Sequence, residues 1–280
     1  MLRRPFVEVP MSRLAAWSWR LALFGLVVVL LSIVVVRSGL LEVYPSLAAF
    51  GAGLALAALA VLLAFASFVS IWRQGYTGLG RALGGLLLAL LLLAYPGYLG
   101  YRASKLPAIN DITTDMENPP RFDKLAHLRP SDRLAYPKQF AALQEKAYPD
   151  IEPLDVDASP RTAFKAALGV VEKRKWQVID ARMPERRRDG VIEAVARTPI
   201  MGFRDDVVIR VSAEGNGSRI DVRSASRYGL RDLGTNAARV ASLLEDLNDA
   251  VSAAPPEPAV APEPEPQRKP ERRKPRRIRR

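Results

Sequence analysis

The chain has 280 residues, 49% of them apolar, with a formal net charge of +12, one histidine and no cysteine. Without cysteine, disulfides, thiolate nucleophiles, cysteine-ligated zinc and iron–sulfur clusters are excluded, because each needs the sulfur atom. The single histidine, His127, excludes any site that needs two imidazole groups. Residues 1–105 carry a net charge of +7, residues 106–266 carry −3 and residues 267–280 carry +8. The stretch long enough for a soluble core is therefore slightly acidic, and the overall basicity is no evidence for a nucleic-acid-binding domain.

Three long uncharged segments predict transmembrane helices. They lie at about residues 20–37, 47–72 and 82–101, within residues 21–102 and after an N-terminal tail of residues 1–20. At 1.5 Å per residue the second and third can cross a hydrocarbon core of about 30 Å, and the first falls just short of it. The uncharged segments 21–36, 43–72 and 82–101 contain no acidic or basic side chain. This pattern favours a membrane anchor over a transporter or a proton path.

Prolines and small residues add detail to the second and third spans. We expect Pro45 to break helical structure before the second span and Pro96 to kink the third helix. Small residues recur four positions apart in the second span, in the pairs Gly53 with Ala57 and Ala60 with Ala64. Such faces let helices approach closely, so one prediction is a homo-oligomer formed through them. The alternative is that an alanine-rich helix produces these pairs by chance.

Basic residues in the short connecting segments predict the orientation. Arginines precede the first span and lie in the loop between the second and third, whereas the loop after the first span holds only Arg37, opposed by Glu42. The positive-inside rule makes the N-terminus cytoplasmic, and three crossings place everything after residue 102 outside. We expect a multi-pass protein of a bacterial inner (plasma) membrane with a periplasmic domain. Arg102 and Lys105 on the outer flank leave a cytoplasm-facing domain as the alternative.

Residues 105–251 are predicted to form one soluble domain. Ser159 as N-cap and Pro160 at the first helical position begin a helix that continues to about Lys173. Segments of alternating apolar and polar residues then predict four strands, at 176–183, 191–198, 207–213 and 218–226. Asp232 caps a final helix that ends near Val251.

Turn residues connect the predicted strands. Asp189–Gly190 and Asn216–Gly217 are typical of hairpin turns, because these residues tolerate a positive φ. An antiparallel sheet with amphipathic helices must bury one face against them. The expected fold class is therefore an α-helical membrane anchor of three transmembrane helices plus an α+β two-layer domain, with a four-stranded or larger antiparallel sheet and flanking helices.

Residues 253–280 hold 8 of the chain's 22 prolines and almost no large apolar side chain. They predict a disordered Pro-rich and polybasic tail, because too little apolar surface is present to fold. We expect the lipid bilayer as a partner, together with an envelope protein or an anionic envelope polymer, and no nucleic acid. If the domain instead faces the cytoplasm, the basic tail binds nucleic acid or anionic lipid.

Arginines gather on one face of the last two predicted strands and just beyond them. The opposite, apolar face is expected to hold Val207, Ile209, Val211, Ile220 and Val222. Because guanidinium groups bind carboxylate or phosphate, the candidate residues for binding an anionic ligand or a partner are Arg210, Arg223, Arg227, Asp232, Asn236 and Arg239. The alternative is a solvated sheet face with cross-strand ion pairs such as Arg210 with Asp221.

Catalysis has few candidate groups in this sequence. The carboxylates Asp205–Asp206 and the cluster around Asp111, with His127, are the groups available for general acid–base chemistry. Turn-forming and capping roles also explain the carboxylates, and no nucleophile motif lies beside the histidine. No metal-ligand spacing or cofactor motif is present, so we expect no metal and no cofactor. We expect binding rather than catalysis, with a cofactor-independent hydrolase or lyase using carboxylates and His127 as the alternative.

Several blocks between residues 109 and 250 resemble one known family. They are Asn110–Asp115 with Pro119, Pro120 and Phe122; Tyr148–Ile151; Phe203–Arg210; and Asp221–Arg227 with Gly229, Asp232–Gly234, Asn236–Ala237 and Arg239–Val240. In these blocks the sequence resembles the domain-of-unknown-function 1499 (DUF1499) family, whose members often follow transmembrane helices. The resemblance implies a single domain that begins near residue 105. It brings no established activity, cofactor or catalytic residue.

Overall fold

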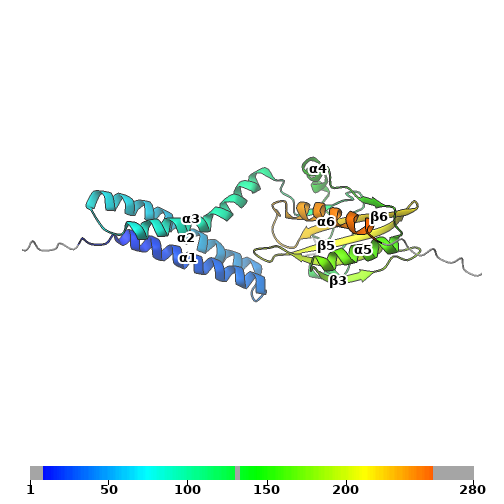
Figure 1. The fold of residues 1–280 in the computed structure, drawn as a ribbon, viewed down its shortest axis with the longest axis horizontal. Helices are drawn as coiled ribbons and strands as arrows, with labels where there is room; N and C mark the ends of the chain where they lie inside the picture. The colour runs from blue at the N-terminus through cyan, green and yellow to red at the C-terminus, as the bar shows by residue number, and fades with distance from the viewer. Residues whose placement is uncertain (1–8, 130–132, 255–280) are drawn as a thin grey trace, which may run out of the picture.

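The computed structural model describes residues 9–129 and 133–254. An N-terminal bundle of three helices is followed by an α+β domain, and the two lie one after the other along the long axis of the molecule (Figure 1). Most of the predicted C-terminal tail, 253–280, and the first eight residues of the predicted N-terminal tail lie outside the described residues.

The bundle consists of α1 (Arg13–Ser38), α2 (Val43–Gln74) and α3 (Leu79–Lys105). All three are long and apolar enough to cross a membrane, which confirms the prediction of three membrane-capable helices. The shortest, with 26 residues, is roughly 39 Å long at 1.5 Å per residue and exceeds a hydrocarbon core of about 30 Å. One detail of the prediction was wrong: Pro45 lies inside the first turn of α2, where no intrahelical partner for its missing N–H is required.

Small residues allow α1 and α2 to pack closely. A Cβ atom on Gly25 would lie 3.0 Å from the carbonyl oxygen of Gly53, and the Ser18 hydroxyl donates a 2.9 Å hydrogen bond to the Ala60 carbonyl. The small residues of α2 that were candidates for contact with another chain are buried inside this bundle, namely Gly53, Ala57, Ala60 and Ala64.

The last part of α3 leaves the bundle and leads to the soluble domain (Figure 1). Pro96 lies inside this helix. Because a proline removes one backbone hydrogen bond and crowds the preceding turn, it accounts for a change of direction here. The turns that follow it bring Arg102 and Lys105 next to the domain.

The domain is built on an antiparallel sheet of six strands in the order β1-β6-β5-β4-β3, with β2 paired to β6 as well. The strands are β1 (Asp111–Thr113), β2 (Leu154–Val156), β3 (Gln177–Arg182), β4 (Gly190–Arg197), β5 (Arg204–Glu214) and β6 (Gly217–Ser226). The four longer strands match the four predicted ones. The three-residue strands β1 and β2, which both pair with β6, are too short to show an alternating pattern and were not predicted.

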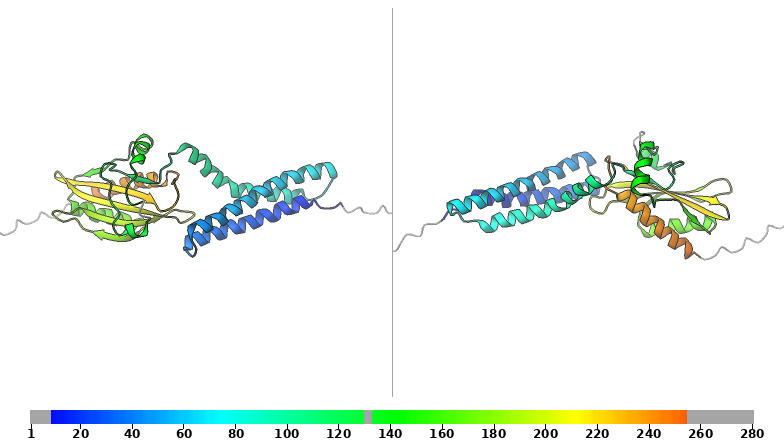
Figure 2. Two further views of the ribbon diagram at one scale, coloured as in Figure 1. Left: turned by 180° about the vertical axis from the view of Figure 1, so that it is seen from behind. Right: turned by 90° about the horizontal axis from the view of Figure 1, so that it is seen from above.

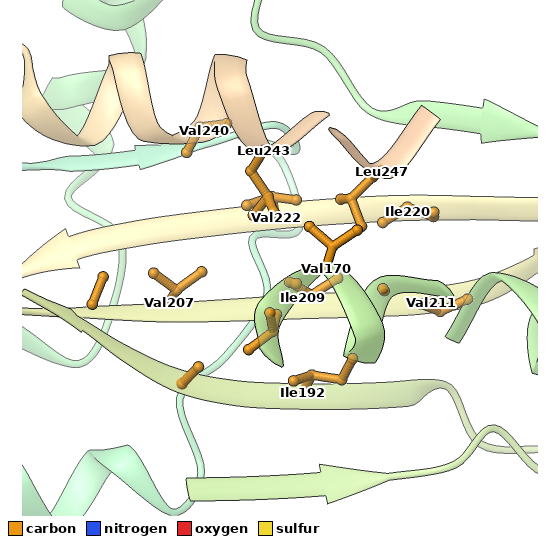
Figure 3. Packing of buried hydrophobic residues seen from close by; sticks show 14 of the residues in the cluster. Val170, Ile192, Val207, Ile209, Val211, Ile220, Val222, Val240, Leu243 and Leu247 are labelled. Atoms are coloured by element: carbon orange, nitrogen blue, oxygen red, sulfur yellow. The ribbon is translucent and has the colours of Figure 1, made fainter. Parts of the chain in front are cut away.

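Helices α5 (Pro160–Lys173) and α6 (Thr235–Ser252) cover one face of the sheet, whereas α4 (Lys138–Ala147) lies on the other side (Figure 2, right). The hydroxyl of Ser159 accepts a hydrogen bond from the Thr162 amide, which confirms the predicted N-cap of α5. The main core forms where α5 and α6 meet the sheet, with Val170, Ile209, Val222 and Leu243 in contact (Figure 3). The two-layer α+β prediction is therefore confirmed.

Both hairpin turns differ from the prediction. Between β5 and β6, Glu214 pairs with Gly217, so the turn residues are Gly215 and Asn216, one position earlier than predicted. Gly215 supplies the positive φ of +54° that this turn needs. Between β3 and β4 the bend lies where Glu185 pairs with Arg188, and Gly190 already belongs to β4.

Candidate functional site

The Arg-rich face of the sheet is covered by the segment that precedes α4. Phe122 and Leu125 from this segment pack against Val195, Val208 and Ala225 of the sheet. Leu125 begins the short 3₁₀ helix η1 (Leu125–Leu128). The Arg-rich face, predicted to bind an anionic ligand or, as the alternative, to face solvent, is therefore an interior face, and its polar side chains must find partners within the protein.

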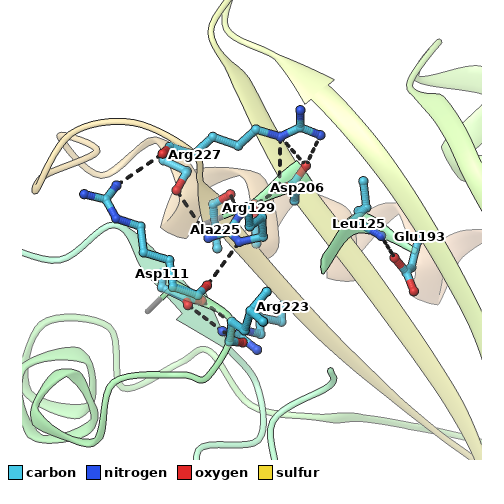
Figure 4. A network of polar contacts seen from close by, with 12 residues as sticks. Asp111, Leu125, Arg129, Glu193, Asp206, Arg223, Ala225 and Arg227 are labelled. Atoms are coloured by element: carbon cyan, nitrogen blue, oxygen red, sulfur yellow. Dashed lines mark hydrogen bonds and ion pairs between the residues drawn. The ribbon is translucent and has the colours of Figure 1, made fainter. Parts of the chain in front are cut away.

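Arg223 of β6 forms a buried ion pair with Asp111 of β1. Its Nε and Nη2 atoms donate to the two carboxylate oxygens at 3.0 and 2.7 Å, and the Arg223 side chain is 1% exposed (Figure 4). Further hydrogen bonds reach the carbonyls of Pro120 and Leu134 at 3.1 and 3.2 Å. Burial raises the pKa of the Asp111 carboxyl, and the hydrogen bonds and charge of Arg223 oppose this shift.

A second buried carboxylate, Asp206 of β5, binds two arginines. Arg129, which directly follows η1, donates to it at 2.7 Å, and Arg227 donates through Nε and Nη2 at 2.9 and 2.7 Å (Figure 4). The guanidinium carbons of Arg129 and Arg223 lie 4.8 and 4.6 Å from the centre of the Phe122 ring. Cation–π contacts thus add to the ion pairs and tie the covering segment to the sheet.

Glu193 of β4 holds the same segment from a third point. Its carboxylate accepts backbone N–H bonds from Asp123, Lys124 and Leu125 at 2.9, 3.1 and 2.7 Å (Figure 4). The residue is fully buried. A carboxylate that receives the free N–H groups at the start of a helix is a stabilising arrangement, and here it fixes η1 on the sheet.

The remaining predicted arginines are also engaged in ion pairs. Arg210 donates to its cross-strand neighbour Asp221 at 2.8 Å and to Asp115 at 2.9 Å. Arg239 of α6 donates to Asp205 at 2.6 Å. Asp205 and Asp206 are consecutive in β5 and point to opposite faces, so their roles are in buried ion pairs rather than in a turn or a cap.

Asn236 and Asp232 organise the start of α6. The Asn236 side chain accepts from the Ser224 hydroxyl at 2.7 Å and donates to the Ser226 hydroxyl at 2.9 Å. The Asp232 carboxylate accepts the backbone N–H groups of Gly234 and Asn236 at 2.9 and 2.7 Å and so stabilises the start of α6. The helix begins at Thr235 with Gly234 at the N-cap position, two residues after the predicted cap Asp232. Burial raises the pKa of Asp232, the neighbouring Asp205 adds to the rise, and the backbone hydrogen bonds oppose it.

The domain contacts the membrane helices through two loops, residues 198–203 and 227–233. The Arg37 guanidinium at the end of α1 donates to the carbonyls of Pro199 and Ile200, the second at 2.9 Å. Arg231 donates to the Ala103 carbonyl at the end of α3 at 2.9 Å. These contacts hold the domain at one end of the bundle.

A cavity of about 300 Å³ lies at this junction. We call it the junction cavity. Its walls come from α2, α3 and both loops, and they combine apolar side chains with charged ones. Among the charged side chains, Asp205 and Asp232 are engaged as described, while Arg102 and Arg231 also line it. Apolar walls with a few convergent polar groups are the usual composition of a ligand site.

Residues 111–247 match the model of the family described as "Protein of unknown function (DUF1499)". This part of the chain is a DUF1499 domain. The match confirms the family expected from the sequence. No curated protein matches the chain.

Three solved structures match 36% of this chain at low sequence identity and low TM-score. Ara h 8.0201 is 13% identical with a TM-score of 0.24, and 95% of its chain is covered. CalU16 from Micromonospora echinospora is 15% identical with a TM-score of 0.22, and 82% is covered. TTHA0849 from Thermus thermophilus is 14% identical with a TM-score of 0.22, and 94% is covered.

The six residues predicted to bind a ligand or partner do not form one open site in the DUF1499 domain. Four of them, Arg210, Arg223, Arg227 and Arg239, are bound to carboxylates of the same chain. Asn236 is fully buried. Asp232 is the one of the six that lines the junction cavity.

The groups considered for catalysis are separated in the DUF1499 domain. His127 is exposed on η1, and it lines neither the junction cavity, which holds Asp205, nor the smaller cavity that holds Asp111. Within residues 9–129 and 133–254, no three histidine or acidic side chains are grouped so that they could hold a metal ion.

Sequence reasoning missed several residues of this arrangement. Glu193 had a detectable signal, since an acid within the apolar strand sequence Val191–Ala196 predicts a buried role that needs partners. Arg129 had none, because it lies in a segment without periodicity. Arg102 was considered only as a charge that flanks the third span, and Arg231 was not among the six predicted residues; only the tertiary structure brings both to one cavity.

Proposed function

We propose that this chain is a membrane-anchored protein of the bacterial envelope, whose DUF1499 domain binds an anionic component of the envelope at its membrane-proximal end. The observation that carries the proposal is the junction: Arg37 and Arg231 connect the domain to the ends of α1 and α3, next to a cavity with charged and apolar walls. The proposed binding surface is therefore at this end of the domain and not on the Arg-rich sheet face predicted from the sequence.

Binding rather than catalysis is supported by the state of the polar groups. The buried carboxylates Asp111, Asp205 and Asp206 are each paired with arginine. In these pairs none of the three carboxylates is free for proton transfer with His127. The hydrolase or lyase alternative therefore has no assembled set of groups in the described part of the chain.

The proposed orientation has the N-terminus in the cytoplasm and the domain in the periplasm, on the inner (plasma) membrane. Arg13, Arg73 and Arg81 lie at the end of the bundle far from the domain, in the first turn of α1, the last turn of α2 and the first turn of α3. Their position supports this orientation through the positive-inside rule. In this compartment an envelope protein or an anionic envelope polymer is accessible to the domain and to the basic tail, and nucleic acid is not.

Reporter fusions test the orientation. Alkaline phosphatase, which is active only in the periplasm, is fused after residue 254 and, as a matched control, in the loop after Gly75. We expect activity from the first fusion and none from the second. The reverse pattern would refute the proposed compartment and favour the cytoplasm-facing alternative, in which the basic tail binds nucleic acid or anionic lipid.

A further inference from the structure

Two arginines in the junction cavity differ from those of the domain interior. Among the described residues, no carboxylate forms an ion pair with Arg102 or Arg231, although both line the cavity. Arg231 donates only to a backbone carbonyl. The cavity's two acids are already engaged, Asp205 with Arg239 and Asp232 with the first N–H groups of α6. The polar end of the cavity therefore offers two guanidinium groups for an anion, and these groups suit phosphate.

The other walls of the cavity are apolar and continue onto the membrane helices. Leu47 of α2 and Leu99 of α3 line it together with Ile200 and Phe203 of the domain. Tyr95 also lines the cavity and is 50% exposed on α3, inside the helix that is apolar enough to cross the bilayer. The cavity thus extends to a helix surface that contacts acyl chains when the helices are in a membrane.

The two loops next to the cavity expose large apolar side chains. Ile200, Tyr228 and Leu230 are 43%, 37% and 79% exposed. Nearby, Leu40 in the connection between α1 and α2 and Tyr44 in the first turn of α2 are 78% and 63% exposed. Apolar and aromatic residues grouped at the end of membrane helices are typical of the interfacial layer of a bilayer. In a bilayer that surrounds the three helices, we infer that the lipid headgroups lie at the mouth of the cavity.

We propose that the junction cavity binds one phospholipid from the surrounding bilayer, with its phosphate at Arg102 and Arg231 and an acyl chain along Leu47, Leu99 and Tyr95. The inference rests on the proposed position of the domain at the membrane surface, and it names the anionic component as a lipid. It does not depend on which side of the membrane the domain faces, so it can be tested apart from the reporter fusions.

The test measures lipid binding to the full chain in mild detergent by native mass spectrometry, with phosphatidylglycerol as the titrated probe. We expect one lipid bound per chain. The double variant Arg102→Gln/Arg231→Gln should weaken this binding at least tenfold. The control variant Arg121→Gln/Arg161→Gln removes the same charge from two exposed positions of the domain and should bind as the wild type does. Equal affinities of the two double variants would overturn the proposal.

A second variant and two competitors test the rest of the site. Leu99→Trp adds volume to the apolar wall and should also weaken binding at least tenfold, whereas unchanged binding would overturn the assigned path of the acyl chain. Glycerol 3-phosphate, which has the phosphate without chains, should not displace the lipid at equal concentration. Diacylglycerol, which has the chains without the phosphate, should bind at least tenfold more weakly. Displacement by the first, or equal binding of the second, would refute phospholipid recognition.

Discussion

Replacing Arg223 by methionine tests whether the Arg-rich face holds the fold together. The side chain is 1% exposed and makes two hydrogen bonds to Asp111 and two to backbone carbonyls. Methionine fills much of the same volume but leaves the Asp111 carboxylate buried without its partner. Removing one member of a buried pair typically costs about 3–5 kcal/mol. This is a large part of a domain stability of about 5–15 kcal/mol.

The assay is hydrogen exchange of the β6 amides in the full chain in detergent, since protection there reports the free energy of opening. At about 1.4 kcal/mol for each factor of ten, protection should fall roughly 10²- to 10⁴-fold. Arg161→Met, an exposed position on α5, should change stability by no more than about 0.5 kcal/mol. The double variant Asp111→Leu/Arg223→Met should be more stable than Arg223→Met, because it removes the unpaired charge. Protection within threefold of the wild type in Arg223→Met would refute a structural role for this pair.

Three further predictions concern other parts of the structure. Glu193→Gln should lower the free energy of unfolding by about 3 kcal/mol, because a buried carboxylate that accepts hydrogen bonds from three backbone amides is lost. Hydrogen exchange of the η1 amides measures this change, and Glu172→Gln at an exposed position is the control. Two aspartates should show opposite pH dependence in urea unfolding followed by circular dichroism between pH 3 and 6. Burial raises the pKa of Asp232 above its ordinary 3.8, so the stability of the wild type relative to Asp232→Asn should fall as the pH rises through the folded pKa. Burial also acts to raise the pKa of Asp115, but hydrogen bonds from backbone amides and an arginine outweigh it and lower the pKa. The stability of the wild type relative to Asp115→Asn should therefore fall as the pH falls through the folded pKa. The same slope of relative stability against pH for both variants would contradict this reasoning. Gly53→Leu should lower the thermal stability of the detergent-solubilised chain, because a Cβ atom at this position would already lie 2.8 Å from a side-chain carbon of α1. An unchanged melting temperature would show that this close packing is not needed.

Much of the fold could be predicted from the sequence, because local rules determine it. Long uncharged segments predict the three membrane-capable helices, and the N-cap Ser159 predicts the start of α5. Alternation identifies the four long strands and the face that packs on the helices. The hairpin turns are one or more residues away from the predicted positions, since several glycine and asparagine residues near a turn fit the same pattern.

The candidate site could not be predicted in the same way. Alternating arginines on a strand look the same whether that face meets water or another segment of the chain. Here the covering segment carries Phe122 and Arg129 and has no periodic pattern. The acid that pairs with Arg223 comes from 112 residues earlier in the chain. Pairings over such distances are set by tertiary structure and are not visible in local sequence.

The arginines of this chain have two different roles, one inside the domain and one at its junction with the membrane helices. Inside the domain, Arg129, Arg223 and Arg227 are bound to two carboxylates, Asp206 and Asp111, so most of their charge is compensated and the pairs attach the covering segment to the sheet. At the junction, Arg37 and Arg231 bind backbone carbonyls instead, which satisfies hydrogen bonds without neutralising the charge. Asp232 likewise binds only backbone groups, so its one negative charge stands against those of Arg37, Arg102 and Arg231, and a net positive charge persists at the end of the domain that adjoins the membrane helices. A charge left in this position attracts the phosphates of a bilayer, which is where a lipid-binding cavity requires it.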